Sequence, residues 1–240
     1  MTRLLTLTFK ELRQMFLSPI AYVFLAIFVA FVNVMFFRGF FLRGQATMAV
    51  FFAWFPIAFS LCLPAIVMRM WAEEWRQGTM EFLLTSPIES WQIVTSKFLS
   101  GASLVMLCVL FTLMVPYTVA QYGDLDPGPV WGGYLGALLM GCACLAVGMF
   151  FSAFTSDQVV SFLLSMAVLL TLVLIGMPFV QDELEPGSTF GRLAAIISPA
   201  THFESIGRGV VDIRDLYYYG GITVFFLYLN TLVIDLRRWR

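Results

Sequence analysis

Six long stretches of this sequence contain no Asp, Glu, Lys or Arg, and no other feature limits the possible folds as strongly. These stretches are residues 14–37, 44–68, 98–123, 127–156, 158–181 and 216–234, and each is 19 to 30 residues long. A helix that crosses the hydrocarbon core of a bilayer needs about 20 apolar residues, because each residue adds ~1.5 Å of length. The pattern therefore predicts an all-α integral membrane protein with six transmembrane helices, forming one transmembrane domain over residues 1–240.

The composition excludes two other classes of protein. Charged residues make up 12% of the chain and hydrophobic residues 60%, whereas a soluble domain carries about 25% charged residues on average. Too few charges remain to cover a water-facing surface, which excludes a soluble enzyme. The formal net charge of −1 provides no basic field for a polyanion, so we expect no nucleic-acid partner. The four cysteines lie in charge-free stretches, and we interpret them as packing residues rather than metal ligands.

The positions of the lysines and arginines predict the orientation of the six spans. If the N-terminus lies in the cytoplasm, nine of these residues fall on the cytoplasmic side and five on the outer side. Cytoplasmic loops of membrane proteins carry an excess of Lys and Arg. We therefore expect both termini to be cytoplasmic.

The residues before the first span predict an amphipathic helix. Apolar side chains recur at helical spacing on one side, at Leu5, Phe9, Leu12 and Phe16. Polar side chains share the other side, at Arg3, Lys10, Arg13 and Gln14. Such a helix is suited to lie in the headgroup layer of the membrane. The alternative is a simple polar lead-in to the first span, where Ser18 and Pro19 predict a new helix start.

The segment between the second and third spans is long enough to contain a helix of its own. Arg69 and Glu73 lie four residues apart, which favours a helix that continues beyond the membrane, and Gly78 is suited to end it. A short cytoplasmic helix is then expected over residues 79–84. Residues 86–89 form a capping box with Pro at the first helical position, which predicts the start of the helix that becomes the third span. A short helix between two long ones is suited to transmit force from a soluble partner; the alternative is an ordinary hairpin loop.

The segment between the fifth and sixth spans predicts two short helices on the outer side. They cover residues 190–197 and 199–207, and a Ser-Pro pair separates them. We expect their apolar side chains to lie on the outer face of the membrane. His202 is the single histidine, and we interpret it as a structural residue because the sequence shows no convergent set of partners.

The fourth span carries small residues at regular spacing. Gly133, Ala137 and Gly141 follow one another at intervals of four, which places them on one face of the helix. Such a face permits the close approach of another helix, either within the subunit or from a second copy. Kinks are expected in the second, third and fifth spans, at Pro64, Pro116 and Pro178.

The interiors of the spans contain no charged residue, and the chain contains no P-loop. Ion-coupled carriers and channels usually place charged groups within the membrane, and an intramembrane protease needs paired catalytic groups there. A P-loop requires Gly before Lys, whereas Lys10 follows Phe9 and Lys97 follows Ser96. Asp157, at a span boundary, is interpreted as a helix cap. The sequence therefore predicts a protein that is not an enzyme, binds no cofactor or metal of its own and takes energy from a partner.

The order of these segments and four sequence blocks resemble the permease subunits of type-2 ABC exporters. The first block, residues 10–23, looks like the opening of the permeases of gliding-motility-type ABC systems. The second, residues 73–87 followed by Lys97-Phe98, is similar to the coupling-helix region of the family. The third and fourth, residues 148–158 and 198–218, resemble the turn after the fourth span and the entry to the last span.

The resemblance implies a transmembrane subunit that pairs with a second permease subunit, the same or a related chain. The pair docks two ABC ATPase subunits, which bind ATP and Mg²⁺. It also implies a bacterial cytoplasmic (inner) membrane, contact with membrane lipid and an auxiliary protein with an outer domain. In this family a short cytoplasmic helix sits in a groove of the ATPase, and that role is carried over to Glu73, Glu74, Gly78, Thr79, Glu81 and Leu84. The resemblance does not give the exported substrate.

Two alternatives from other classes stay open. One is a membrane-embedded enzyme that uses the outer segment around His202, Glu204 and Asp212; activity of the purified protein without ATP would support it. The other is a membrane anchor that recruits a cytoplasmic protein without transport. Vesicle uptake assays with and without the ATPase would distinguish the anchor from the exporter.

Overall fold

The computed structural model of the chain describes residues 2–43, 47–80, 88–183, 189–207, 209 and 212–238. All regular secondary structure in these residues is α-helical. Six helical segments among them are long and apolar enough to cross a membrane, which confirms the predicted all-α membrane fold. Helices suit this role because a helix satisfies its own backbone hydrogen-bonding groups where no water is present.

The spans follow the predicted order. Four of them are single helices, namely α2 (Pro19–Arg43), α9 (Pro127–Ser152), α10 (Gln158–Ile175) and α14 (Ile213–Arg238). The second span consists of α3 (Ala49–Ala53), α4 (Phe55–Met70) and α5 (Ala72–Gln77), and the third of α7 (Ser90–Phe111) and α8 (Met114–Ala120). The remaining helices are α1 (Thr2–Leu17), α11 (Pro178–Glu183), α12 (Thr189–Ile197) and α13 (Pro199–Gly207).

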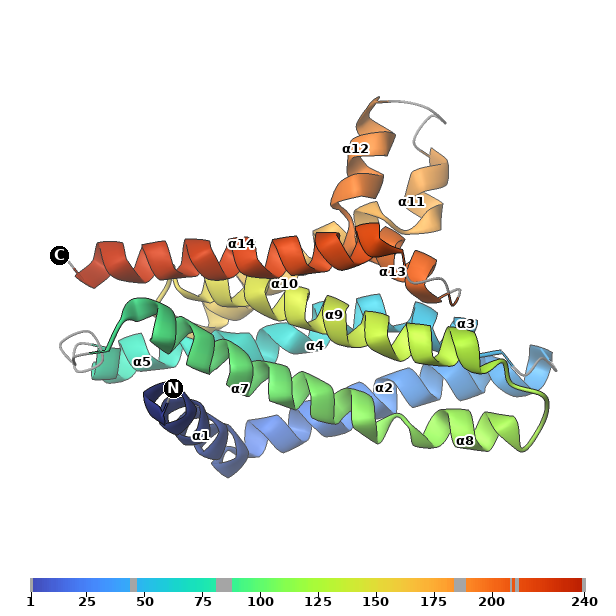
Figure 1. The fold of residues 1–240 in the computed structure, drawn as a ribbon, viewed down its shortest axis with the longest axis horizontal. Coiled ribbons are helices and arrows are strands. Elements are labelled where there is room, and N and C mark those ends of the chain that lie inside the picture. The colour runs from blue at the N-terminus through green and yellow to red at the C-terminus, as the bar shows by residue number, and fades with distance from the viewer. Residues whose placement is uncertain are drawn as a thin grey trace.

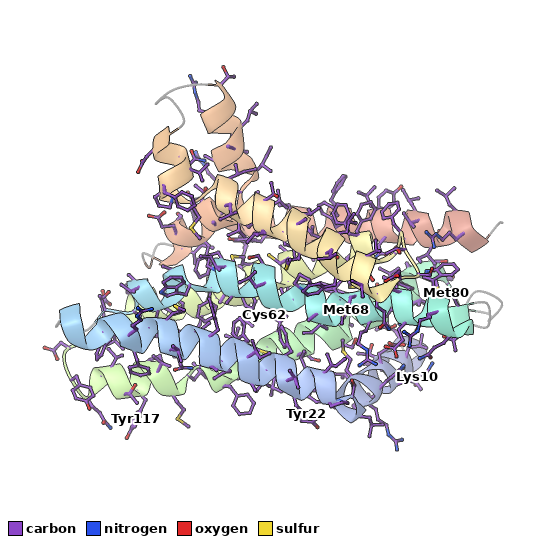
Figure 2. The ribbon with its side chains drawn as sticks, turned by 180° about the vertical axis from the view of Figure 1, so that it is seen from behind. Lys10, Tyr22, Cys62, Met68, Met80 and Tyr117 are labelled. Atoms are coloured by element: carbon purple, nitrogen blue, oxygen red, sulfur yellow. The ribbon has the colours of Figure 1, made fainter. Side chains whose placement is uncertain are left out.

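Both chain termini lie at one end of the bundle, which we call the terminal end (Figure 1). The opposite end, which we call the far end, holds α3, α8 and α13, and α11 and α12 project from the bundle beside it. Figure 2 places Lys10 of α1 and Met80, shortly after α5, at the terminal end, and Tyr117 of α8 at the far end. The end of α5 and the start of α7 therefore lie at the same end as α1 and the C-terminus of α14.

The small-residue face of α9 packs inside the same chain. Of an apolar 18-residue segment of α9, 67% is buried inside the protein, compared with 17% of the corresponding segment of α14. A Cβ atom on Gly133 would lie 2.3 Å from the Phe52 ring of α3, and one on Gly141 would lie 2.5 Å from Val105 of α7. Ala137, between them on this face, is fully buried. The contacts of Gly133 and Gly141 are thus made within the subunit, and α9 lies at its centre.

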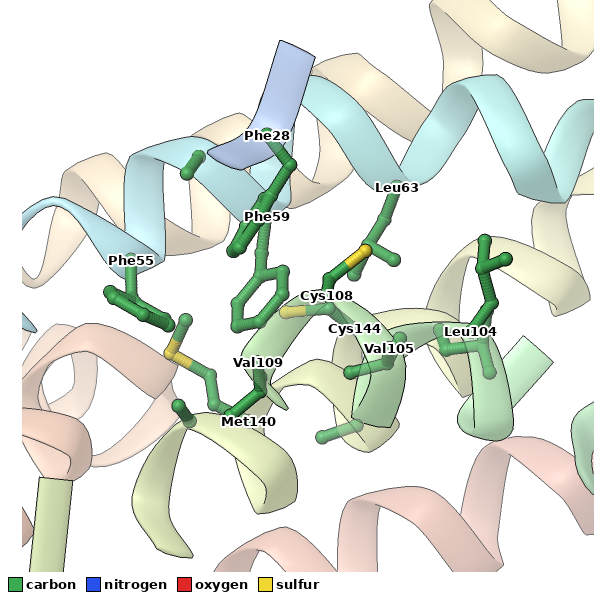
Figure 3. Close-up of a cluster of buried hydrophobic side chains, with 14 of the residues drawn as sticks. Phe28, Phe55, Phe59, Leu63, Leu104, Val105, Cys108, Val109, Met140 and Cys144 are labelled. Atoms are coloured by element: carbon green, nitrogen blue, oxygen red, sulfur yellow. The ribbon is translucent and has the colours of Figure 1, made fainter. Parts of the chain in front are cut away.

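Aromatic and sulfur-containing side chains fill the middle of the bundle (Figure 3). Phe28 of α2 stacks on Phe59 of α4 with ring centroids 4.9 Å apart. Cys108 of α7 and Cys144 of α9 lie in the same cluster, with exposed fractions of 0% and 2%. All four cysteines are free thiols. Buried cysteines in such surroundings act as small hydrophobic residues, which fits their interpretation as packing residues.

The third span breaks beside Pro116. Proline has no backbone N–H, so the carbonyl oxygen of Thr112, four residues earlier, loses its regular helical partner. That oxygen accepts hydrogen bonds from the backbone N–H of Val115 at 3.0 Å and from the Tyr134 hydroxyl of α9 at 3.0 Å, and α7 gives way to α8 at this point. Pro178 begins α11, after the fifth span has ended, whereas α4 continues through Pro64.

The start of α7 corrects one prediction. This helix begins at Ser90 rather than at Pro87, and the backbone of Glu89 is extended, with φ −77° and ψ 141°. The Ser90 hydroxyl donates to the Asp235 carboxylate of α14, and the Glu89 carboxylate accepts from the Trp91 indole. In a capping box the Glu side chain would bind the backbone at the helix start. Here the Glu89 side chain binds the Trp91 side chain instead of the backbone.

The predicted amphipathic helix, α1, has three faces rather than two. It packs on α7 along the side that holds the buried Thr8 and the partly buried Glu11. Leu5 and Phe9, which are 55% and 72% exposed, form a separate apolar face. Lys10 is exposed on the third face. Because the protein covers neither Leu5 nor Phe9, the apolar face remains available to the membrane.

The position of α13 corrects the expectation for the second outer helix. Its Phe203 and Ile206 are only 3% and 0% exposed, so α13 lies inside the far end of the bundle instead of on an outer surface. The Phe203 ring lies parallel to that of Phe55, with centroids 6.4 Å apart. A Cβ atom on Gly136 of α9 would lie 3.1 Å from Ile206, so the absence of a side chain there makes room for α13. By contrast, α12 exposes its apolar side chains, at Leu193, Ile196 and Ile197.

Candidate coupling site

Three helices that are far apart in the sequence meet around Lys97 at the terminal end. The Lys97 ammonium donates to Glu74 Oε1 of α5 at 2.6 Å and to Glu11 Oε2 of α1 at 3.1 Å. The Lys97 side chain is 3% exposed and each carboxylate side chain 12%. A buried ammonium without partners would be very costly, so the two carboxylates allow a charged residue to lie here. We call these three residues the Lys97 triad.

The geometry of the second span places Glu74 beside Lys97. The span bends at Trp71, between α4 and α5, and the Trp71 side chain is fully buried. The Lys97 ammonium lies 5.2 Å from the centroid of the Trp71 ring, within the range of a cation–π interaction. The helix α5 then ends at Gly78, whose φ of 69° is left-handed. Glycine adopts this conformation without steric cost, which confirms that Gly78 ends the helix.

Arg69 forms a second link at this end. Its guanidinium binds the Glu73 carboxylate through two hydrogen bonds, from Nε to Oε2 at 2.7 Å and from Nη2 to Oε1 at 2.9 Å. A third N–H donates to the Ser18 hydroxyl, at the joint of α1 and α2. The contact expected from the spacing of Arg69 and Glu73 is confirmed. Because these side chains are 28% and 18% exposed, the pair contributes less to stability than a fully buried one.

The last helix is attached to the same region. The Arg237 guanidinium of α14 lies 4.7 Å from the centroid of the Trp75 ring of α5, and it donates to the carbonyl oxygen of Phe154 at 3.0 Å. The contact between Ser90 and Asp235 joins α14 to the start of α7. The terminal end thus connects α1, α5, α7, α14 and the turn after α9 through polar side chains.

The residues expected to contact an ATPase fall into different positions. Glu73 and Glu74 point into the protein, where they bind the cations described above. Gly78 and Thr79 are exposed where the hairpin leaves α5. Glu81 and Leu84 lie outside the described residues, as do the other residues of the range 81–87.

The structure brings Glu11, Ser18 and Lys97 to this site; no role was predicted for Glu11 or Lys97, and Ser18 was expected only to start the first span. Each lies in a block that carries the family resemblance, either 10–23 or Lys97-Phe98. A signal for Lys97 was present, since a lysine directly before a charge-free stretch needs a carboxylate partner when it is buried. The identity of that partner depends on packing between helices, which the sequence pattern does not contain.

At the far end, His202 has a partner that the sequence did not indicate. Its Nδ1 lies 2.7 Å from Asp215 Oδ1 of α14, and its ring stacks on Tyr218 with centroids 3.9 Å apart. The Asp215 side chain is 6% exposed. Asp212, which the enzyme alternative required beside His202, instead accepts from the backbone N–H of Arg214 at 3.0 Å. The contacts of His202 join α13 to α14, which agrees with a structural role.

Comparison with known families supports the same class of protein. The family described as ABC-2 family transporter protein matches residues 37–234, a range that includes Arg69, Glu74, Lys97 and three of the four resembling blocks. No curated protein gives a significant match. A family match over most of the chain, together with six helices able to cross a membrane, is decisive for its class. The chain belongs to the ABC-2 transporter family and is a membrane permease subunit of an ABC transporter.

Proposed function

We propose that this permease subunit pairs with a second one, the same or a related chain, and that the pair docks two ATPase subunits and exports a substrate. ATP and Mg²⁺ would bind to the ATPase subunits, which supply the energy. Membership of the ABC-2 family supports ATPase partners in general. The observation that carries the proposal is the Lys97 triad, because it joins the hairpin helix α5 to both α7 and α1.

In the proposed mechanism, the ATPase contacts the segment that follows Gly78. Residues Thr79, Glu81 and Leu84 belong to this contact, and Glu73 and Glu74 act behind it. Movement of the segment would pull α5, and the buried pair of Glu74 with Lys97 would pass that movement to α7. A buried charge that loses its partner is destabilised by about 3–5 kcal/mol. The contact is therefore strong enough to make the helices move together instead of sliding apart.

This proposal requires the terminal end to face the cytoplasm, where ATP is present. The nine-to-five distribution of Lys and Arg supports that orientation, in a bacterial inner membrane. We expect an impermeant thiol reagent, added to intact cells, to label a cysteine at Glu204 but not one at Gln77, in a background without the native cysteines. Both positions are exposed. Labelling of Gln77→Cys alone would reverse the orientation.

The mechanism is tested by comparing the chain's two lysines. Lys97→Met removes the centre of the triad, whereas Lys10→Met changes an exposed lysine of α1. Each variant is reconstituted in liposomes with its ATPase, and permease-stimulated ATP hydrolysis and co-purification of the ATPase are measured. We expect Lys97→Met to retain the bound ATPase but lose most of the stimulation, and Lys10→Met to retain both. Full stimulation by an intact Lys97→Met protein would remove the triad from the coupling path.

The closer resemblance to gliding-motility-type permeases stays a prediction. It depends on the block 10–23, and the matched range begins at residue 37. The match therefore supports the family as a whole without distinguishing its branches. Purification of the permease with its natural partners, followed by identification of the bound proteins, would test the branch and the presence of an auxiliary outer-domain protein.

A further inference from the structure

A cavity of about 310 Å³ lies at the terminal end, between α1, the start of α2, the joint of α4 and α5, and α7. Part of its wall is charged and consists of Glu11, Arg69, Glu73, Glu74 and Lys97. The proposed coupling uses some of these side chains as links between helices, but it gives no function to the space that they enclose.

Much of the rest of the wall belongs to the charge-free stretches that are expected to cross the membrane. It includes Ala21 of α2, Ile66 of α4 and Leu104 of α7, which belong to three of the charge-free stretches. The charged residues lie outside those stretches. The cavity therefore crosses the boundary between lipid headgroups and hydrocarbon, and a ligand that fills it must have a charged part and an apolar part.

The charged part of the cavity has an excess of negative charge. Three carboxylates face two cations; Arg69 pairs with Glu73, and Lys97 is shared between Glu11 and Glu74. Within the part of the chain that the structure describes, the second oxygen of Glu74, Oε2, is buried and has no hydrogen-bond partner. A buried acceptor without a donor is destabilising, and more so when it is charged. A cation bound in the cavity next to Glu74 would offset this excess of negative charge without a direct bond to Oε2.

We propose that this cavity binds the headgroup of a lipid that carries a primary ammonium. The ammonium donates to Glu74 and Glu11, and the adjoining methylene groups lie along Ala21 and Ile66. A primary ammonium has three N–H donors, as a lysine side chain does, whereas a trimethylated headgroup has none. Ligand cavities measure about 300–1,000 Å³, so this one holds a headgroup and the groups next to it but not a whole lipid. Binding of this kind does not depend on the proposed coupling to an ATPase.

Lipid selectivity of the purified permease tests the proposal. Native mass spectrometry is carried out in detergent with phosphatidylethanolamine, phosphatidylcholine and phosphatidylglycerol that have identical acyl chains. We expect phosphatidylethanolamine to be retained at an about tenfold lower concentration than the other two, a difference that corresponds to about 1.4 kcal/mol. Equal retention of the three lipids by the unmodified protein would overturn the proposal.

Three variants locate the binding site. We expect Glu74→Gln to abolish the preference for phosphatidylethanolamine, because the carboxylate that accepts from the ammonium is lost. The matched control, Glu204→Gln, changes an exposed glutamate of α13 and should keep the preference. Ala21→Leu fills the apolar part without removing any charge, so it should lower retention of phosphatidylethanolamine while the ion pairs remain. A preference unchanged in both cavity variants would contradict the assignment.

Two further outcomes separate the proposal from its nearest alternatives. If free ethanolamine displaces the lipid as effectively as phosphatidylethanolamine itself, the ligand is a soluble amine and the lipid assignment is wrong. If Glu74→Gln loses the co-purifying ATPase while its lipid preference is unchanged, the carboxylate serves a protein contact and the proposal also fails. A Lys97→Met permease that keeps both its stimulation of the ATPase and its lipid preference would contradict the coupling mechanism alone.

Discussion

The two ends of the bundle are held together by different interactions. At the terminal end, buried charges join helices that are distant in the sequence, with Lys97 bound to Glu11 and Glu74. At the far end, α13 inserts Phe203 and Ile206 into a space that α9 leaves open, and the contact of His202 with Asp215 lies beside this packing. Closely packed side chains resist small changes of volume, whereas a buried charge is sensitive to the loss of its partner.

The difference agrees with the proposal that movement enters this permease at the terminal end. Interdigitated rings at the far end can separate only if many contacts are lost together. The terminal end adds a few buried polar contacts between helices to its apolar packing, and these contacts can transmit a pull from one helix to the next. The comparison predicts that removal of a charge has its largest effect at the terminal end, and that added volume has its largest effect around α9.

The largest expected effect is that of Lys97→Met. Without the ammonium, Glu11 and Glu74 face each other as buried carboxylates, and we expect a loss of about 3–5 kcal/mol in stability. Thermal unfolding in detergent measures the change, with Lys10→Met as the control at an exposed lysine. Equal midpoints for the two variants would mean that the charges at the terminal end are solvated, and the contrast between the ends would disappear.

The second effect concerns added volume at the centre of α9. Ala137 is fully buried between Gly133 and Gly141, so Ala137→Leu should cost about 1–3 kcal/mol through overpacking. The same substitution at Ala30, an exposed position of α2, should have little effect. Oligomer size in detergent is measured with the thermal midpoint. An unchanged midpoint for Ala137→Leu would show that α9 can move aside, contrary to its central position.

A smaller effect is expected at the far end from Asp215→Asn. The amide keeps a hydrogen bond to His202 but loses the charge, so we expect a loss of about 0.5–1.5 kcal/mol. Asp212→Asn is the matched control, because Asn caps a helix about as well as Asp does. If Asp215→Asn were as damaging as Lys97→Met, both ends would depend on buried charge to the same degree.

The smallest effect is expected from Glu73→Gln. Its pair with Arg69 is partly exposed, and such pairs contribute about 0.2–1 kcal/mol. The substitution is compared with Lys97→Met in the same thermal assay, at low and high salt, because screening weakens exposed pairs more than buried ones. A loss as large as that of Lys97→Met would place Glu73, and not the triad, at the centre of the terminal end.

Features that depend on neighbouring residues were predicted well. The six spans, the end of α5 at Gly78 and the cap at Asp157 all follow from local chemistry. The Asp157 carboxylate accepts from the backbone N–H groups of Val159 and Val160 at 2.7 and 3.3 Å. The predicted start of α7 was wrong by three residues. The signal for that start was also local, but Ser90 binds Asp235 of another helix.

The candidate site shows the same division. Glu73 and Glu74 were recognised from a motif, but their inward orientation was not, since it depends on Arg69 and Lys97. Similarly, α13 has the apolar residues of a surface helix. Its burial results from Gly132 and Gly136 of α9, which lie more than 60 residues earlier in the chain.

The sequence by itself determined the membrane class, the number of spans and the places where several helices end. The reason is that lipid requires each span to satisfy its own backbone groups and to exclude charge over about 20 residues, and both conditions are local. The tertiary structure decided which helix lies at the centre, which outer helix is buried and which carboxylates bind Lys97. The partners of Lys97 lie 86 and 23 residues away, and only the packing of α1, α5 and α7 brings them together.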